Sequence, residues 1–147
     1  MDISNASKQL RELVRILERK LGVLKDNKFS RCNITLAQCH ALVEIGRSGS
    51  ISLNELAELL NLENSTMSRT VNNLVTADLA KRDIDPKDRR YVTISLTDTG
   101  VELFKSIEDS MNSYFGKIFD AIPHEKKLQV LDGLQILLEA IDNSEGS

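Results

Sequence analysis

A chain of 147 residues with a formal net charge of −3 is long enough to bury a hydrophobic core and short enough for one domain. Its 41% hydrophobic and 28% charged residues are typical of a globular protein. No apolar run approaches the roughly 20 residues that span a bilayer, and the first residues lack the basic and then apolar pattern of a signal peptide. We therefore expect a cytoplasmic protein with no membrane partner.

Charge is distributed unevenly along the chain. Residues 8–31 hold 8 basic and 3 acidic side chains (+5), residues 63–97 hold 6 and 5 (+1), and residues 98–147 hold 4 and 10 (−6). DNA responds to the local field within roughly 8–10 Å, so the negative total does not exclude a nucleic-acid partner. The acidic C-terminal third is the part least suited to contact phosphates.

Hydrophobic spacing and capping patterns predict four helices in the first half of the chain. Apolar residues three and four positions apart predict a long helix over residues 5–28. Capping-box patterns at residues 35–38 and 52–55 open two more helices. A fourth helix is expected over residues 64–77, with these inward positions: Met67, Val71, Leu74 and Val75.

A strand hairpin and two further helices are predicted in the second half. Strands are expected near residues 80–84 and over 91–96, joined by the turn residues 85–88. Val92, Ile94 and Leu96 alternate with polar residues and should face inward. Thr97 should cap a long helix, Pro123 should open a last helix that reaches residue 143, and the remaining tail should be frayed. The fold class is thus mainly α with a small β-hairpin wing.

The predicted helix over residues 64–77 carries an outward face that suits DNA. At 100° per residue, the positions opposite the apolar side hold hydrogen-bonding side chains and no carboxylate: Ser65, Arg69, Asn72 and Thr76. An ordinary solvated helix face usually mixes Lys with Glu. Because a short capped helix precedes this one, we interpret residues 64–77 as a recognition helix for the major groove.

The tip of the predicted hairpin is basic. Asp88 lies two residues before Arg90, so on a strand both side chains would point to the same side, where the carboxylate could orient the guanidinium. An oriented arginine suits a narrow minor groove. The alternative is a surface ion pair worth about 0–1 kcal/mol. Lys87 and Arg89 crowd the same tip, which favours a DNA contact and completes the layout of a winged helix-turn-helix.

In these segments the sequence resembles the MarR (multiple antibiotic resistance regulator) family of bacterial transcription regulators. The resemblance is carried by residues 56–74, 79–82, 85–90 and 95–100. It implies an obligate homodimer on a pseudopalindromic operator, and a small-molecule effector or redox signal. It also places Ser65, Thr66, Ser68 and Arg69 on the recognition helix, and it makes Arg90 the wing arginine with Asp88 as its partner.

Two positions depart from the family pattern. Asp78 stands where the family usually has Gly after the recognition helix; Asp tolerates the left-handed conformation, so we expect the fold to survive with a weaker C-cap. Glu63 stands where the family often has Ser at the start of that helix. Glutamate favours the helix dipole but is a poor N-cap.

The terminal helices carry more leucines than one winged-helix core can cover, which predicts a homodimer. The alternative is that these helices pack only on each other. We expect one domain over residues 1–147. Its DNA-binding lobe should span about 35–97, flanked by N- and C-terminal dimerisation helices at about 5–28 and 98–143.

The cysteines and histidines offer two alternative roles. Two Cys and two His could form a zinc site, but Cys39 and His40 are adjacent and diverge by about 100° on a helix, so we expect no metal. Cys39 is interpreted as a small core residue. Cys32, in a predicted loop beside Arg31, is the candidate for a redox-sensing thiol.

We therefore expect a DNA-binding transcriptional regulator, a repressor relieved by a small molecule, with double-stranded DNA and a second copy of the chain as partners. The alternatives are a redox-sensing regulator that uses Cys32, and a winged-helix module that binds protein rather than DNA. The sequence contains no catalytic triad, paired-carboxylate or Gly-rich phosphate motif, so we expect neither an enzyme nor a cofactor.

Overall fold

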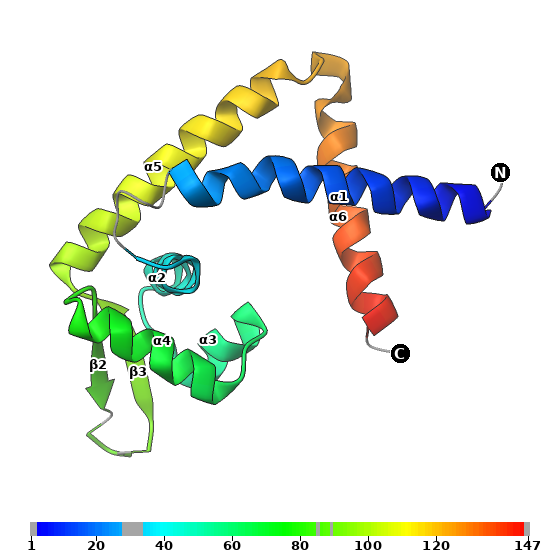
Figure 1. Cartoon of the computed structure of the whole chain (residues 1–147). Coiled ribbons are helices and arrows are strands. Elements are labelled where there is room, and N and C mark those ends of the chain that lie inside the picture. The colour runs from blue at the N-terminus through cyan, green and yellow to red at the C-terminus, as the bar shows by residue number, and fades with distance from the viewer. Residues whose placement is uncertain (1–2, 28–33, 85, 89, 146–147) are drawn as a thin grey trace. The chain divides into compact units, whose positions relative to one another are not determined.

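The computed structural model describes residues 3–27, 34–84, 86–88 and 90–145. The chain divides into two compact units, Met1–Glu108 and Asp109–Ser147. Its elements are drawn in Figure 1 and follow in this order: α1 (Ile3–Asn27), α2 (Leu36–Ser48), β1 (Ile51–Ser52), α3 (Leu53–Leu60), α4 (Asn64–Thr76), β2 (Ala80–Ile84), β3 (Val92–Leu96), α5 (Asp98–Ala121), the 3-10 turn η2 (His124–Lys126) and α6 (Lys127–Glu145). Within the described residues, no helix is both long and apolar enough to cross a membrane.

The starts of α2 and α3 follow from local capping chemistry. Thr35 and Gln38 form the expected capping box, in which each side chain bonds the other residue's backbone N–H, and this prediction is confirmed. Ser52 also caps α3 as predicted by accepting from the backbone N–H of Glu55. In a capping box the Glu55 side chain would also accept from the backbone N–H of Ser52. Here the Glu55 carboxylate accepts from the Ser52 hydroxyl instead, at 2.9 Å.

Helices α3 and α4 end in the same way. Asn61 and Asp78 adopt the left-handed conformation, with φ of 54° and 61°. In each case this residue and the next one donate their N–H groups to carbonyls of the last helical turn, which is a Schellman motif. The left-handed conformation expected at Asp78 is thus confirmed, and it lets the chain leave α4 directly into β2.

A three-stranded antiparallel sheet adjoins these helices, in the order β1-β3-β2. β1 was not predicted, because two residues give no periodic signal; it pairs Ile51 with Ile94. β2 has the predicted bounds, whereas β3 begins at Val92 rather than at residue 91. The expected alternation in β3 is only partly right, because Ile94 is buried while Val92 and Leu96 are half-buried like the polar residues between them.

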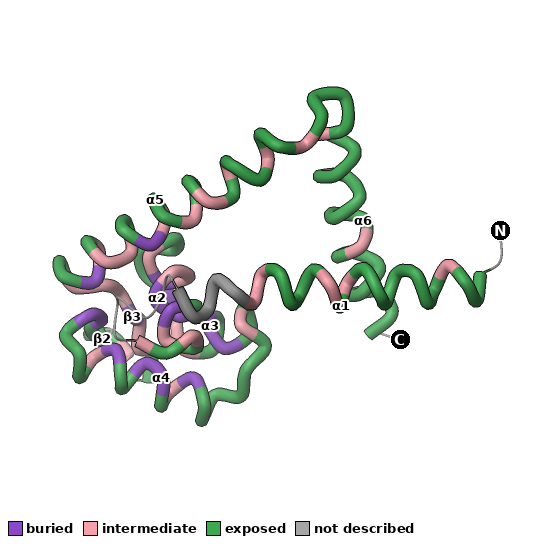
Figure 2. The backbone as a smooth tube through the Cα atoms, turned by 45° about the horizontal axis from the view of Figure 1, so that its top comes forward, coloured by how far each residue is buried: buried purple, intermediate pink, exposed green. Residues whose placement is uncertain are grey.

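The hydrophobic core lies within α2, α3, α4 and the sheet (Figure 2). The largest completely buried side chains come from all four parts: Leu42, Ile45, Leu56, Met67, Val71, Leu74 and Ile94. The inward positions predicted for α4 are confirmed, although Val75 is only half-buried and Thr70 is buried as well. The Thr70 hydroxyl is satisfied by donating to the Thr66 carbonyl at 3.1 Å.

The start of α5 is fastened to the turn after α4. Thr97 caps α5 as predicted, since its hydroxyl oxygen accepts from the Gly100 N–H at 3.0 Å. The same hydroxyl donates to the Asp78 carbonyl at 2.6 Å, and the Thr97 N–H donates to the Leu79 carbonyl at 3.1 Å. A side chain at Gly100 would collide with the Leu79 carbonyl. The first turn of α5 therefore requires glycine at this position.

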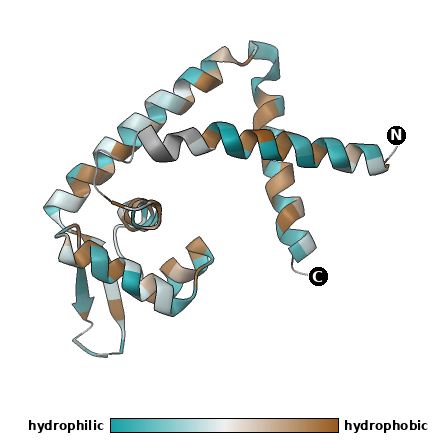
Figure 3. Cartoon of the chain, in the orientation of Figure 1, coloured by the Kyte–Doolittle hydropathy of each residue, from teal (hydrophilic) through white to brown (hydrophobic). Residues whose placement is uncertain are grey.

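The second unit consists of the end of α5, η2 and α6. Pro123 is the N-cap of η2, so the last helix starts at the predicted place but begins with a 3-10 turn, and α6 continues to Glu145, two residues beyond the predicted end at residue 143. The Lys127 ammonium joins the two helices by donating to the Phe119 and Ile122 carbonyls at 2.5 and 2.7 Å. No residue of α6 is buried among those described, and apolar residues recur along its length (Figure 3).

Candidate nucleic-acid interface

The outward face of α4 is open to solvent. Ser65, Thr66, Arg69, Asn72 and Thr76 are exposed, and Ser68 is half-buried. The apolar side of the helix is held in the core by Met67, Val71 and Leu74. The fold therefore presents these polar side chains as one surface, and none of the exposed positions between Asn64 and Thr76 carries a carboxylate.

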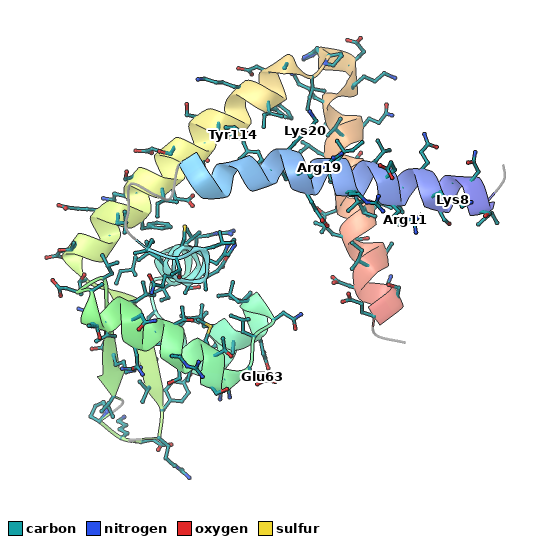
Figure 4. The ribbon with its side chains drawn as sticks, viewed as in Figure 1. Lys8, Arg11, Arg19, Lys20, Glu63 and Tyr114 are labelled. Carbon is teal, nitrogen blue, oxygen red and sulfur yellow. The ribbon has the colours of Figure 1, made fainter. Side chains whose placement is uncertain are left out.

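The N-terminus of α4 is held by a neighbour instead of by its own cap. Glu63 occupies the N-cap position and forms no side-chain capping bond, as its residue type predicts. Figure 4 places Glu63 at the start of the helix. The Asn64 side chain donates through Nδ2 to the side-chain Oδ1 of Asn54 in α3 at 2.8 Å, which joins the two helices of the helix-turn-helix. An acidic group at this end disfavours a phosphate there, so phosphate contacts are better placed further along α4.

The wing arginine is oriented by Asp88. The Arg90 guanidinium donates through Nε to Asp88 Oδ1 at 3.1 Å and through Nη2 to Oδ2 at 3.4 Å. The backbone N–H of Arg90 donates to the same Oδ1 at 3.0 Å, which forms an Asx turn. The predicted pairing is confirmed, but its geometric basis was wrong: both residues lie in the loop before β3, and the turn, rather than a strand, brings their side chains together.

This pairing leaves the arginine available to a ligand. The Arg90 side chain is 92% exposed and that of Asp88 is 46% exposed. The hydrogen bonds from the Arg90 side chain and from its backbone N–H lower the pKa of the Asp88 carboxyl, so Asp88 is ionised at neutral pH. Lys87 is also exposed on this loop, while Arg89 lies outside the described residues.

A contact between the wing and the recognition helix was missed by the sequence analysis. The Arg82 guanidinium of β2 donates through Nη2 to the Asn72 Oδ1 of α4. The register pairs Arg82 with Ile94, which is buried, so Arg82 lies on the face of the sheet that packs against the helices. The alternation of residues in β2 could have indicated this side, but it gives no distance to α4.

Another basic surface lies on α1. Lys8, Arg11 and Arg19 are exposed there, and Figure 4 shows their side chains together with that of Lys20. Arg15 is paired with Glu12 at 3.5 Å. This distribution agrees with the positive charge of residues 8–31.

The cysteine and histidine residues do not form a common site where they are described. Cys39 is 3% exposed in the core, which confirms its expected role, and His40 and His124 are exposed on separate elements. Among the residues described, no three His, Cys, Asp or Glu side chains are grouped so as to hold a metal ion. Cys32, the redox candidate, lies outside the described residues.

A three-helix core with a three-stranded sheet, an exposed second helix of the helix-turn-helix and an arginine-tipped hairpin define a winged helix-turn-helix protein. Residues 34–92 match the profile of the MarR family. The chain is similar to the transcriptional repressor MdtR of Bacillus subtilis, with 26% identity over 76% of this chain and 72% of MdtR. It is also 28% identical to the multiple antibiotic resistance protein MarR of Salmonella typhimurium, over 69% of this chain and 71% of that protein.

The fold is shared with solved structures. FabT of Streptococcus pneumoniae, crystallised with DNA, superposes with a TM-score of 0.78 at 20% identity, over 97% of this chain and 99% of FabT. Residues 34–92 of the chain thus carry a MarR-family domain, and the chain as a whole shares its winged-helix fold with FabT.

Proposed function

We propose that this chain is a homodimeric DNA-binding repressor that acts on a pseudopalindromic operator. In the proposed complex, α4 lies in the major groove and the wing reaches the adjacent minor groove. The observation that carries this proposal is the exposed, carboxylate-free face of α4, together with an arginine of the hairpin loop that Asp88 orients. MdtR is named as a transcriptional repressor, which supports repression as the mode of regulation. FabT was crystallised with DNA, which supports DNA as the partner.

Dimerisation is proposed from the apolar surface of the terminal helices. Leu128, Leu134 and Leu138 of α6 are 75%, 45% and 60% exposed, and Leu10, Leu13 and Leu17 of α1 are exposed as well. Exposed apolar side chains in such numbers are unfavourable in water unless a partner covers them. A second copy would do so, and it would place two α4 helices on two half-sites about 10 base pairs apart. In this proposal residues 1–147 act as one functional domain.

Relief by a small-molecule effector is the remaining part of the proposal, and it rests on the match of residues 34–92 to the MarR family. The physical route that the fold offers is the fastening of α5 to the end of α4 by Thr97. A ligand that moved α5 would also move the turn after α4 through these hydrogen bonds, so the position of α4 and the affinity for DNA would change together.

The test is selection of bound fragments from a random pool of double-stranded DNA by the purified chain. We expect enrichment of a two-fold symmetric site whose half-sites are centred about 10 base pairs apart. In gel shifts, the fraction of an enriched fragment bound by the protein should then decrease as salt is raised above the physiological concentration, because phosphate contacts release counterions. Failure to enrich any sequence, with binding to DNA no stronger than that of an unrelated acidic protein, would favour the winged-helix module that binds protein.

A further inference from the structure

The contact between Arg82 and Asn72 assigns a role to a residue outside the recognition helix. We propose that Arg82 is a positioning residue that fixes the Asn72 amide, so that α4 presents N–H donors and favours guanine over adenine at one base pair of each half-site. This inference rests on the proposed function, because it requires Asn72 to face DNA. The two side chains are exposed and come from β2 and α4 respectively.

The orientation of the Asn72 amide follows from the chemistry of its partner. A guanidinium carries N–H donors and no acceptor, so the amide atom that faces Arg82 must be the oxygen. The Nδ2 group is consequently turned away from Arg82. A bond from a charged donor is stronger than one between neutral groups, which favours this orientation of the amide over the flipped one.

The fixed orientation restricts which base edge Asn72 can recognise. An asparagine that reads adenine accepts from N6 through its oxygen and donates to N7 through its nitrogen. In this chain Arg82 occupies one of the two lone pairs of that oxygen and holds the atom toward β2, so the groups best placed for DNA are the Nδ2–H donors of Asn72 and the remaining N–H donors of Arg82. Guanine offers two acceptors, O6 and N7, on its major-groove edge. A pair that presents mainly donors therefore matches guanine better than adenine.

The sheet supplies a matched control residue. Cross-strand partners share a face of the sheet, and Arg82 pairs with the buried Ile94 whereas Lys81 pairs with Ser95 on the opposite face. Lys81 therefore carries the same charge one residue away, on the side that does not face α4. Asp83 also lies on that opposite side, where its carboxylate accepts from the Ser95 hydroxyl at 3.2 Å.

The first experiment needs no DNA. In a ¹H–¹⁵N spectrum of the free protein, the side-chain NH₂ signals of Asn72 should shift in Arg82→Met and stay unchanged in Lys81→Met. An unchanged Asn72 signal in Arg82→Met would overturn the positioning role, whatever the protein binds. Because this measurement does not depend on DNA, it separates failure of the inference from failure of the proposed function.

The second experiment compares selected DNA sites for the wild type and its variants. We expect the wild type to favour guanine over adenine at one position of each half-site by about fivefold or more, the lower end of what one base contact provides. Arg82→Met should lose or reverse that preference, because the freed oxygen can accept from adenine N6. Arg82→Lys should keep it, since the ammonium is also a donor, and Lys81→Met should keep it while binding all sequences more weakly.

Asn72→Ala keeps the test informative if Arg82→Met proves unstable. It alters an exposed helix position, and it should abolish the same guanine preference as Arg82→Met. A loss of affinity in Arg82→Met that is uniform across all sequences would assign Arg82 to a phosphate contact and overturn the inference. An unchanged preference at every position would also overturn it. If the wild type selects no DNA while the NMR shift is present, the proposed function fails and the contact is structural.

Discussion

The winged helix-turn-helix lobe, residues 35–97, and the second unit, Asp109–Ser147, differ in how well each buries its apolar side chains. The lobe places seven large side chains below 2% exposure and draws them from α2, α3, α4 and β3. The second unit has comparable leucine content, yet Leu128, Ile136 and Leu138 of α6 are at least 60% exposed. The lobe thus buries its large apolar side chains within itself, whereas the second unit leaves leucines of α6 exposed in the single chain, and the proposed dimer would cover them. The most direct ways to test this contrast are substitutions that should affect one region and spare the other.

The largest expected effect is loss of the proposed dimer. Leu134→Glu combined with Leu138→Glu places two charges on the apolar stripe of α6, where each leucine contributes about 1.5–3 kcal/mol if a partner buries it. Light scattering at micromolar concentration should report a mass near twice 16.5 kDa for the wild type and near 16.5 kDa for the variant.

The matched control adds the same two charges elsewhere on α6. Gln129→Glu combined with Asn143→Asp alters exposed polar positions on the other side of the helix, and it should keep the dimeric mass. A wild-type mass near that of one chain would contradict the proposal, and the exposed leucines would then need a different partner.

The next effect concerns the lobe alone. Gly100→Ala should lower the free energy of unfolding by about 1–3 kcal/mol, because the added methyl group collides with the Leu79 carbonyl and a backbone cannot move aside as a side chain does. Thermal unfolding of the variant beside Thr99→Ala, an exposed neighbour in the same turn, checks this. Equal transition temperatures for the two variants would show that the start of α5 is more loosely held than its contacts indicate.

The lobe was also the region that the sequence specified best. Thr35, Ser52 and Thr97 gave the correct starts of three helices, because capping depends on residues within a single turn. The bounds of β2 and the inward side of α4 followed from periodicity. Two features were not predicted: β1, which has two residues, and the contact between Arg82 and Asn72. Both depend on distances between elements that are separate in the sequence, and neither propensity nor spacing encodes such distances.

The wing and α4 should differ in what each loses when its arginine is removed. Arg69→Ala should weaken binding to the selected operator by about 1–3 kcal/mol if it removes a bidentate base contact. Arg90→Ala should lose most affinity for sites with narrow, A·T-rich flanks, where a minor-groove arginine gains most. Gel shifts on operators that differ only in their flanks distinguish the two.

The control for these arginines is Arg47→Ala, which removes an exposed arginine of α2 that is paired with Glu44 and lies outside the proposed interface. It should bind both operators as the wild type does. If Arg90→Ala binds the A·T-flanked operator undiminished at physiological salt, the wing assignment is wrong. All three variants should keep the thermal transition of the wild type, because these exposed positions lie outside the core.

The smallest expected effect is the titration of the wing carboxylate. The hydrogen bonds from Arg90 depress the pKa of Asp88 in the folded chain. Any stabilisation of the folded state by these bonds is therefore fully present above the ordinary aspartate pKa of about 3.9, and it is lost as the pH falls through the lower pKa of the folded chain. The orientation of Arg90 should therefore not change between neutral pH and pH 5. A ¹³C NMR titration should place the Asp88 midpoint below the ordinary value in the wild type and return it upward in Arg90→Ala. A wild-type midpoint at or above the ordinary value would mean that the pair is too weakly populated in water to orient the arginine, and the wing would then bind DNA through charge alone.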